Sequence, residues 1–264
     1  MRICHTVPLG SRTVVTRVLG RLMLFVQTAD RAHAIHLMMN GYWEFELTRA
    51  IARAARRGTL AIDCGANYGY FAHVMAHFVG AAGHVVAIEP NPMIGILLKD
   101  SLRVNGFQSR TSVIEQAAWD TPHQEVEFMV PDTHPMNAKL QSLNRRQNRE
   151  ETNKVAIVRT MVLDELLALG RPVSVLKIDV EGAELETLCG AEKLIAQNPA
   201  INIFLEVNRS RYEDPLALVT ILARHGLVAR RLHASGAHPV VDMEAFCQNS
   251  ASDPAMWWLT REVA

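Results

Sequence analysis

The sequence predicts an α/β fold built on one mostly parallel sheet, and three observations lead to that prediction. Apolar runs of strand length alternate with segments of helix length between residues 59 and 225. Several of these runs end in an acidic residue. The last two apolar runs, 227–233 and 256–261, have no helix of crossover size between them, so they should pair antiparallel. We therefore expect a seven-stranded sheet with helices on both faces and an antiparallel pair at its C-terminal edge.

The chain has 264 residues, 49% of them apolar, which is enough for one substantial hydrophobic core. Residues 1–57 form an expected N-terminal extension. Within it we predict a short hairpin across 21–39, turning at Thr28-Ala29-Asp30, and a helix over 42–57. The main domain is then expected over 58–264.

The elements of the main domain follow in order. The expected strands are 59–64, 84–89, 111–118, 173–180 and 201–207, ahead of the final two, and the expected helices are 68–79, 93–104, 163–169, 183–196 and 215–225. Two β-prone runs, 125–130 and 154–162, predict a hairpin with a long loop inserted near 125–160. A loop of that length inside a compact domain is usually functional, and its position suggests that it covers the substrate.

Charge and cysteine content limit the classes of partner and the compartment. Lysine plus arginine and aspartate plus glutamate number 27 each, which gives no reason to expect nucleic-acid binding and favours a neutral small acceptor. Four cysteines lie far apart with no C-x-x-C pair, as expected in a reducing compartment. Arginines 12, 17 and 21 interrupt the first apolar residues, so neither a signal peptide nor a membrane span is expected there. These features predict a cytoplasmic, soluble protein.

The most informative motif is LAIDCGANYGYF at residues 60–71, where a strand ends in an acid and a turn of small residues opens a helix. Gly65 and Gly69 allow a ligand to lie against the main chain and the next helix to pack closely. A phosphate-binding P-loop would need Gly-Lys-Ser/Thr, which is absent. The dinucleotide fingerprint G-x-G-x-x-G would need a glycine where Asn67 stands. The turn therefore suits a nucleoside better than a polyphosphate.

Two acids refine this hypothesis. Asp63 would repel a pyrophosphate but attract an ammonium or sulfonium, and Glu89, which ends the next strand, could accept hydrogen bonds from a ribose diol. S-adenosylmethionine carries all of these groups. The alternative is that Asp63 caps the following helix and Glu89 is only a polar strand end.

Further charged residues end the later strands. Asp179 and Glu206 each close an apolar run, and the carboxyl ends of parallel strands meet at one edge of a sheet, where ligands bind. Lys177 lies inside an apolar strand and is costly to bury unless an acid, Asp179 or Glu181, pairs with it. The two acids could instead only cap the next helix. Arg209, Arg211 and Tyr212 follow at the same edge, either touching an acceptor or forming a solvated loop.

Four motifs, DCGANYGYF, EPNP at 89–92, LDEL at 163–166 and LKIDVEGAE, resemble the FkbM family of S-adenosylmethionine-dependent methyltransferases over roughly residues 42–207. The resemblance implies a class I methyltransferase (Rossmann-like) fold. It also implies methyl transfer to a hydroxyl on a sugar, glycan, polyketide or similar secondary metabolite. The expected partner is thus a small-molecule or glycan acceptor, and the oligomeric state stays open.

The resemblance also implies roles for individual residues. Asp63, Gly65, Asn67 and Gly69 would lie at the methionine part of the cofactor, Glu89 at the ribose, Gln116 and Ala117 at the adenine, and Asp179 at the transferred methyl or the amino group. The catalytic group would be Asp179, Glu181 and Lys177. Glu206 and Glu44 are expected on the acceptor side.

Methyl transfer requires alignment of the acceptor oxygen and loss of its proton. Glu181 or Asp179 could act as the base, or the pair could hold a divalent metal, with oxygen ligands favouring Mg²⁺ or Ca²⁺. We do not favour a metal, because capping and cofactor contacts already use these acids. A cofactor-binding module without turnover is the alternative function. A nicotinamide dehydrogenase is disfavoured by the missing glycine fingerprint.

Overall fold

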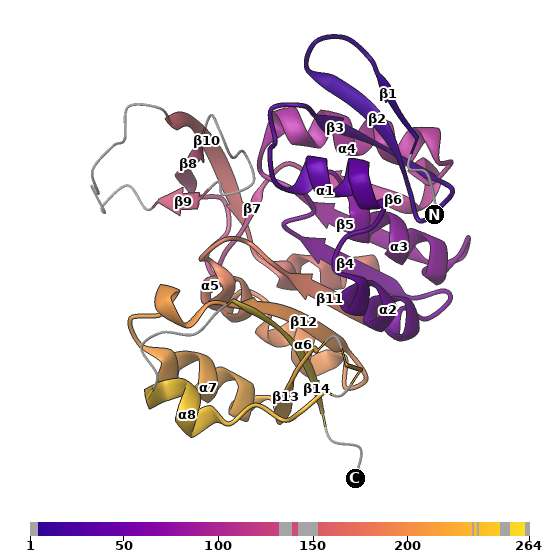
Figure 1. Cartoon of the computed structure of the whole chain (residues 1–264). Coiled ribbons are helices and arrows are strands. Elements are labelled where there is room, and N and C mark those ends of the chain that lie inside the picture. The colour runs from indigo at the N-terminus through magenta and orange to yellow at the C-terminus, as the bar shows by residue number, and fades with distance from the viewer. Residues whose placement is uncertain are drawn as a thin grey trace.

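The computed structural model describes residues 5–131, 139–141, 153–233, 235–236, 238–248 and 254–261. Within them lies a seven-stranded sheet, whose strands in spatial order are β13 (Leu227–Arg231), β14 (Ala255–Arg261), β12 (Asn202–Val207), β11 (Val173–Ile178), β4 (Leu60–Cys64), β5 (His84–Ile88) and β6 (Thr111–Ile114). β14 runs antiparallel to both of its neighbours, and the other pairings are parallel (Figure 1). The predicted fold class is confirmed. β14 pairs antiparallel with β13 as expected, and it also separates β13 from β12.

Helices cover both faces of the sheet because side chains alternate along each strand. On one face α2 (Phe45–Ala54), α3 (Tyr70–Val79) and α4 (Pro92–Val104) share a core with Ala61 and Val85. On the other face α5 (Glu184–Cys189), α6 (Glu192–Gln197) and α7 (Pro215–Arg224) share a core with Ile62. The short helix α8 (Met243–Gln248) packs on α7.

Two predicted helices differ in detail. Residues 183–196 form α5 and α6 rather than one helix, and residues 163–169 form a 3-10 helix, η3 (Leu163–Leu169). The break between α5 and α6 falls at Gly190, where an added Cβ would lie 2.0 Å from the carbonyl oxygen of Trp119. The helix is interrupted where the segment that contains Trp119 passes close to it. A pattern of apolar residues does not reveal such a contact.

The N-terminal segment forms a three-stranded antiparallel sheet of β1 (Thr6–Pro8), β2 (Thr13–Val18) and β3 (Leu22–Gln27), followed by α1 (His33–Asn40). The predicted hairpin across 21–39 is therefore wrong. The hairpin turns earlier, at Gly20. Asp30 precedes α1 and stabilises its start, since its carboxylate accepts hydrogen bonds from the backbone N–H groups of Ala32, His33 and Ala34. The predicted helix over 42–57 is present in its central part, as α2.

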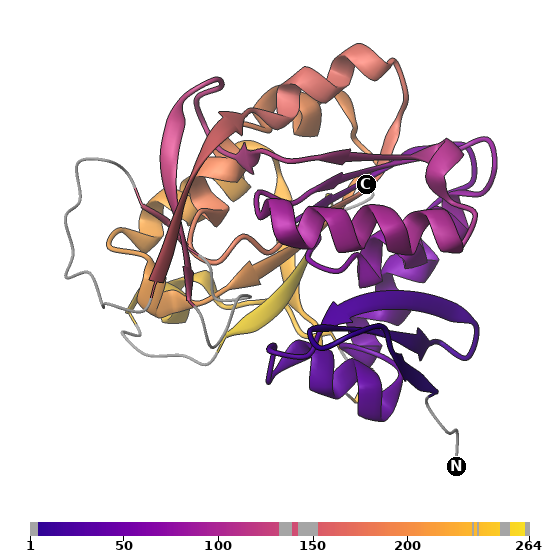
Figure 2. The same ribbon diagram turned by 90° about the horizontal axis from the view of Figure 1, so that it is seen from above.

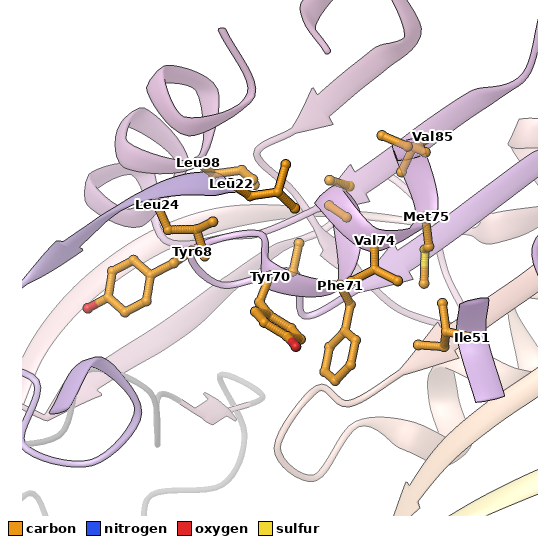
Figure 3. Packing of buried hydrophobic residues seen from close by; sticks show 14 of the residues in the cluster. Leu22, Leu24, Ile51, Tyr68, Tyr70, Phe71, Val74, Met75, Val85 and Leu98 are labelled. Atoms are coloured by element: carbon orange, nitrogen blue, oxygen red, sulfur yellow. The ribbon is translucent and has the colours of Figure 1, made fainter. Parts of the chain in front are cut away.

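This small sheet packs against α4, as both views of the molecule show (Figures 1 and 2). The N–H of Phe25 donates to Ser101 Oγ at 2.9 Å, and the N–H of Met23 donates to Asn105 Oδ1 at 3.0 Å. Figure 3 shows Leu22 and Leu24 beside Leu98 in the same core. The N-terminal segment therefore shares its core with the main sheet, and the division at residue 57 stays a prediction.

The inserted hairpin consists of β8 (Glu125–Pro131) and β10 (Asn153–Met161), paired antiparallel. β9 (Lys139–Gln141) pairs with β8, and β7 (Ala117–Ala118) pairs with β10, which makes a second sheet. The predicted strand 111–118 is thus divided between two sheets. The long loop, apart from β9, lies outside the described residues. No helix among the described residues has both the length and the apolar character needed to cross a membrane.

Gly65 closes β4 where the chain passes against the end of β11. Its φ is +74°, and an added Cβ would lie 1.8 Å from the carbonyl oxygen of Asp179. Gly58 has a similar φ of +80° but open space around it. We expect Gly58→Ala to cost about 1 kcal/mol of unfolding free energy, from the left-handed backbone alone. Gly65→Ala should cost at least about 2 kcal/mol more, because backbone must move. Urea unfolding measures both, and equal costs would contradict this.

Candidate active site

A pocket opens at the carboxyl ends of β5, β4, β11 and β12. Three interstrand spacings of about 4.8 Å separate β5 from β12, so the pocket extends over roughly 14 Å. Glu89 lies at its β5 end, Asp179 near its middle and Glu206 at its β12 end. The acids that the sequence placed at one edge of the sheet do meet there, with one exception described below.

At the β5 end, backbone groups fix the carboxylate of Glu89. Glu89 Oε2 accepts the N–H of Asn67 at 2.8 Å, and Oε1 accepts the N–H of Asn91 at 2.9 Å. Burial raises the pKa of Glu89 to about 7, and the two N–H donors oppose that rise. Asn67 has a left-handed backbone with φ of 51°, which turns its N–H toward the carboxylate. The result is a rigid hydrogen-bond acceptor on the pocket wall.

Apolar side chains form the wall next to Glu89. Ile88 comes from β5, Ile94 from α4, Ala117 from β7 and Phe128 from the inserted strand β8. Ile94, Ala117 and Phe128 belong to elements other than β5, the strand that ends just before Glu89. The sequence motifs identified only Ala117, because the other side chains reach the pocket through the tertiary packing. Together they make an apolar slot beside a carboxylate, which suits a flat base attached to a ribose.

In the middle of the pocket, Lys177 links two acids. Its Nζ lies 3.1 Å from Asp179 Oδ2 and 3.6 Å from Asp63 Oδ1, and the side chain is 1% exposed. Register explains the contact, because Lys177 on β11 pairs directly with Asp63 on β4. Burial alone would lower the pKa of Lys177, but the charges of Asp179 and Asp63 raise it above its ordinary value. Lys177 is therefore an ammonium group held between two carboxyl groups.

Asp63 is the exception among the strand-end acids. It is fully buried and does not line the pocket. Burial raises its pKa, and the charge of Lys177 opposes the rise. Asp63 therefore contacts Lys177 instead of lining the pocket, because the parallel register sets its side chain beside that of Lys177 on the same face of the sheet.

At the β12 end, Arg211 binds three acids. Its guanidinium forms an ion pair with Glu181, another with Glu206 at 2.9 Å, and a longer one with Glu184 at 3.5 Å. Burial raises the pKa of Glu206 to about 7, helped by Asp179 and Glu181 and opposed by Arg211. Arg211 joins acids from the ends of β11 and β12 and is therefore not simply part of a solvated loop, while its contact with an acceptor stays a prediction.

The remaining wall comes from the N-terminal segment. His33 at the start of α1, and Trp43 and Glu44 just before α2, line the pocket. Glu44 was expected on the acceptor side, whereas His33 and Trp43 were not identified. No motif marks them, since only the packing of α1 on β2 and of α2 on α3 brings them to the strand ends.

The sequence-predicted residues divide into two groups. Those that line the pocket are Gly65, Asn67, Glu89, Ala117, Lys177, Asp179, Glu181, Glu206 and Glu44. Those that do not are Asp63, Gly69 and Gln116. An added Cβ on Gly69 would lie 2.1 Å from Leu98 Cδ1, so this glycine allows α3 and α4 to pack closely. Gly69 was expected to let a helix pack closely, and this contact with Leu98 gives that expectation a structural basis.

Carboxylate oxygens of Asp179, Glu181 and Glu206 lie within 4.8 Å of one another. This spacing could hold a cation. Arg211, however, already binds Glu181 and Glu206, and Lys177 binds Asp179. The two side-chain cations therefore compensate the acids that a divalent metal would need.

The strand order, with β14 inserted antiparallel between β12 and β13, and a nucleoside-type pocket at the strand ends define a class I methyltransferase. A family model described as the methyltransferase FkbM domain matches residues 63–229. The chain belongs to the FkbM methyltransferase family and is an S-adenosylmethionine-dependent methyltransferase. No curated protein matched the chain in the comparison.

Several solved structures are similar to the chain at low identity. An rRNA methylase from Clostridium thermocellum is 11% identical, covering 83% of this chain and 95% of its own, with a TM-score of 0.48. An S-adenosylmethionine-dependent O-methyltransferase from Thermotoga maritima is 12% identical, covering 95% and 78%, with a TM-score of 0.43. Aeropyrum pernix fibrillarin, with bound S-adenosylmethionine, is 13% identical, covering 98% and 100%, with a TM-score of 0.44.

The residues present fit S-adenosylmethionine. Glu89 offers carboxylate oxygens for a ribose diol beside an apolar slot for adenine, and Asp179 offers a carboxylate for a cationic group. When bound, the cofactor supplies an electrophilic methyl group on a sulfonium. The protein's own part is to hold the two reactants in line.

Removal of the central ammonium should destabilise the fold. In Lys177→Met the buried Asp63 loses its cation, and we expect a loss of about 3–5 kcal/mol in unfolding free energy. The double variant Lys177→Met with Asp63→Asn should recover part of that loss. Lys99→Met, which breaks an exposed pair with Glu115, should cost less than about 1 kcal/mol. Urea unfolding compares them, and a Lys177→Met cost as small as the Lys99→Met cost would refute the pairing.

Glu184 should make stability depend on pH. It is 1% exposed, and burial raises its pKa to about 7 from 4.5. The folded protein therefore keeps this proton between pH 4.5 and 7 while the unfolded chain releases it. The contribution is complete below pH 4.5 and is lost as the pH rises through 7, by up to about 3 kcal/mol. Urea unfolding from pH 5 to 8 should show wild type losing stability relative to Glu184→Gln. A difference that stays constant with pH would contradict this.

Proposed function

We propose that the protein transfers a methyl group from S-adenosylmethionine to a hydroxyl of an uncharged small molecule or glycan, a sugar or secondary metabolite. The observation that carries this is the set of ionisable groups in the pocket: five acidic side chains, those of Glu44, Glu89, Asp179, Glu181 and Glu206, line it with one ammonium, from Lys177. Such a lining attracts a sulfonium and provides acceptors for hydroxyl groups.

Proposed roles follow from position along the pocket. Glu89 binds the ribose, Ala117 contributes to the adenine slot and Asn67, with Gly65, shapes the turn beneath the cofactor. Asp179 faces the methyl or amino group, and Lys177 fixes its orientation. Asp63 acts through Lys177, and Glu181 and Glu206 belong to the acceptor side with Arg211. Gln116 and Gly69 would support the site from outside it.

The same charges argue against other substrates and cofactors. An anionic acceptor, such as a phosphate ester or a nucleic-acid backbone, would meet carboxylates on most of the wall. A divalent metal would have to displace Arg211 and Lys177 from the acids that they bind. We therefore propose metal-independent transfer, with positioning of the reactants supplying most of the rate enhancement. We further propose that it acts in the cytoplasm, because the described cysteines Cys64, Cys189 and Cys247 are free thiols.

Titration calorimetry with S-adenosylmethionine and S-adenosylhomocysteine tests the cofactor half. We expect micromolar binding by wild type, about 10–100-fold weaker binding by Glu89→Gln because charge-assisted hydrogen bonds to the ribose are lost, and unchanged binding by the surface control Glu46→Gln. No heat from folded wild type would refute the proposal and favour a module that does not use the cofactor.

The acceptor half is tested with radiolabelled S-adenosylmethionine and two matched panels, neutral methyl glycosides and the corresponding sugar phosphates. We expect label in the neutral panel and none in the phosphates. Transfer to the phosphates alone would contradict an uncharged acceptor.

A further inference from the structure

The pocket has a wall that the strand-end motifs do not supply. His33, Trp43 and Glu44, all from the segment that contains α1 and α2, line the same pocket as Asp179, Glu181 and Glu206. Both His33 and Glu44 lie close enough to Asp179 for its charge to act on them. Glu89 and the apolar slot lie at the β5 end. If the cofactor's nucleoside occupies the β5 end, the N-terminal wall is left for the acceptor.

His33 is the first sign of a ligand at this wall. It is 5% exposed, and neither ring nitrogen has a hydrogen-bond partner among the described residues. Its ring packs against Trp43 with the centroids 4.3 Å apart. Burial lowers the pKa of His33 to about 3, so the ring is neutral and has one donor and one acceptor nitrogen. A buried polar side chain normally has a partner, and a hydroxyl can both donate to and accept from such a ring.

Glu44 is the second sign, because its surroundings differ from those of Asp179, Glu181 and Glu206. Lys177 binds Asp179, and Arg211 binds Glu181 and Glu206. Among the described residues, no cation lies within ion-pair distance of Glu44, and no hydrogen bond joins its carboxylate. Its oxygens are thus free to accept a proton from a ligand, while those of the other acids already interact with cations.

The backbone holds Glu44 in this place. Its φ of 36° is left-handed, a conformation that non-glycine residues rarely adopt and that is concentrated at functional sites. Two contacts of Thr48 secure the turn, since its N–H donates to the carbonyl of Glu44 at 2.9 Å and its hydroxyl donates to the carbonyl of Trp43 at 2.8 Å. Asn67 and Glu181, also at the pocket, share the left-handed conformation.

We propose that His33, Trp43 and Glu44 form the acceptor subsite, where His33 hydrogen-bonds a ring hydroxyl, Trp43 packs on the ring and Glu44 is the general base. This rests on the proposed function. It assigns to Glu44 the proton transfer that the sequence had left between Asp179 and Glu181.

The reaction is balanced as follows. The acceptor's O–H bond breaks and its proton forms an O–H bond on the Glu44 carboxylate. The electron pair on the acceptor oxygen forms the new bond to the methyl carbon, and the electrons of the broken C–S bond remain on sulfur. Glu44 is accessible to solvent at the pocket mouth, so it can release the proton to water after each turnover.

The charges around Glu44 suit a base at neutral pH. Glu44 is open to solvent on one side and enclosed by the pocket on the others, and this enclosure, with the charges of Asp179 and Glu206, raises its pKa to about 7 against the opposing charge of Lys177. The hydroxyl of Tyr70 also faces this group and bonds to Thr48 Oγ1 at 3.1 Å. A base whose pKa lies near the working pH transfers protons most effectively.

The first test separates the acceptor subsite from the cofactor site by calorimetry with S-adenosylhomocysteine. Glu44→Gln and His33→Phe should bind it within twofold of wild type, as should the control Glu46→Gln on the first turn of α2, while Glu89→Gln binds more weakly. Circular dichroism confirms that each variant is folded. More than tenfold weaker binding by folded Glu44→Gln or His33→Phe would overturn the assignment. Absence of binding by wild type would instead refute the proposed function.

The second test measures the base directly. Carbon-13 NMR of protein labelled at the glutamate side-chain carboxyl, with S-adenosylhomocysteine bound, should show several resonances that titrate near pH 7, because Glu89, Glu184 and Glu206 also have raised pKa values. The resonance that is missing in Glu44→Gln belongs to Glu44, and it should be one of those that titrate near pH 7. A midpoint below pH 5.5 for that resonance would overturn the proposal. With the neutral methyl glycoside that turns over fastest, Glu44→Gln should lower kcat by about 10²–10⁴-fold, whereas unchanged kcat would also overturn it.

Discussion

The contact of Lys177 with Asp63 and Asp179 is the constraint on which the rest of the site depends. An ammonium buried to 1% exposure is tolerated only because the parallel register of β4 and β11 places an acid directly beside it. The same contact orients Asp179 at the centre of the pocket. The charge that would otherwise destabilise the core thus fixes the position of the carboxylate closest to the expected chemistry.

Arg211 has the corresponding role at the β12 end. It joins Glu181 and Glu184, which follow β11, to Glu206 on β12, so the ends of two neighbouring strands are connected through one guanidinium. The fork geometry of arginine suits several carboxylates better than a lysine would. Among the residues that the structure describes, Glu44 and Glu89 are the pocket-lining acids that form no ion pair with either cation.

The N-terminal segment contributes both to the hydrophobic core and to the wall of the pocket. Its small sheet packs on α4 and contributes Leu22 and Leu24 to the core, while α1 and the turn before α2 complete the pocket wall. In a fold whose main sheet is common to many chemistries, function depends on what is added at the strand ends. Here the addition precedes β4 and the turn of Gly65 and Asn67 that lines the pocket.

The sequence by itself determined the sheet and the edge of the sheet at which its acids meet. Strands that alternate with helices pair in parallel, so acids at their carboxyl ends meet at one edge of the sheet. This argument correctly predicted that Glu89, Asp179 and Glu206 lie together. The sequence prediction failed for the hairpin at 21–39, because Asp30 could be taken for a turn residue or a helix cap and only packing decides between them.

Tertiary structure alone decided which side chains reach the pocket. Whether Asp63 lines the pocket or only contacts Lys177 depends on strand register, and the placement of Phe128 and His33 depends on how an inserted hairpin and α1 pack. Local patterns encode helix and strand periods and the chemistry of turns, but they do not encode contacts between residues more than a hundred positions apart. Those contacts arise from burial of apolar surface, which is not directional and is satisfied only in the complete fold.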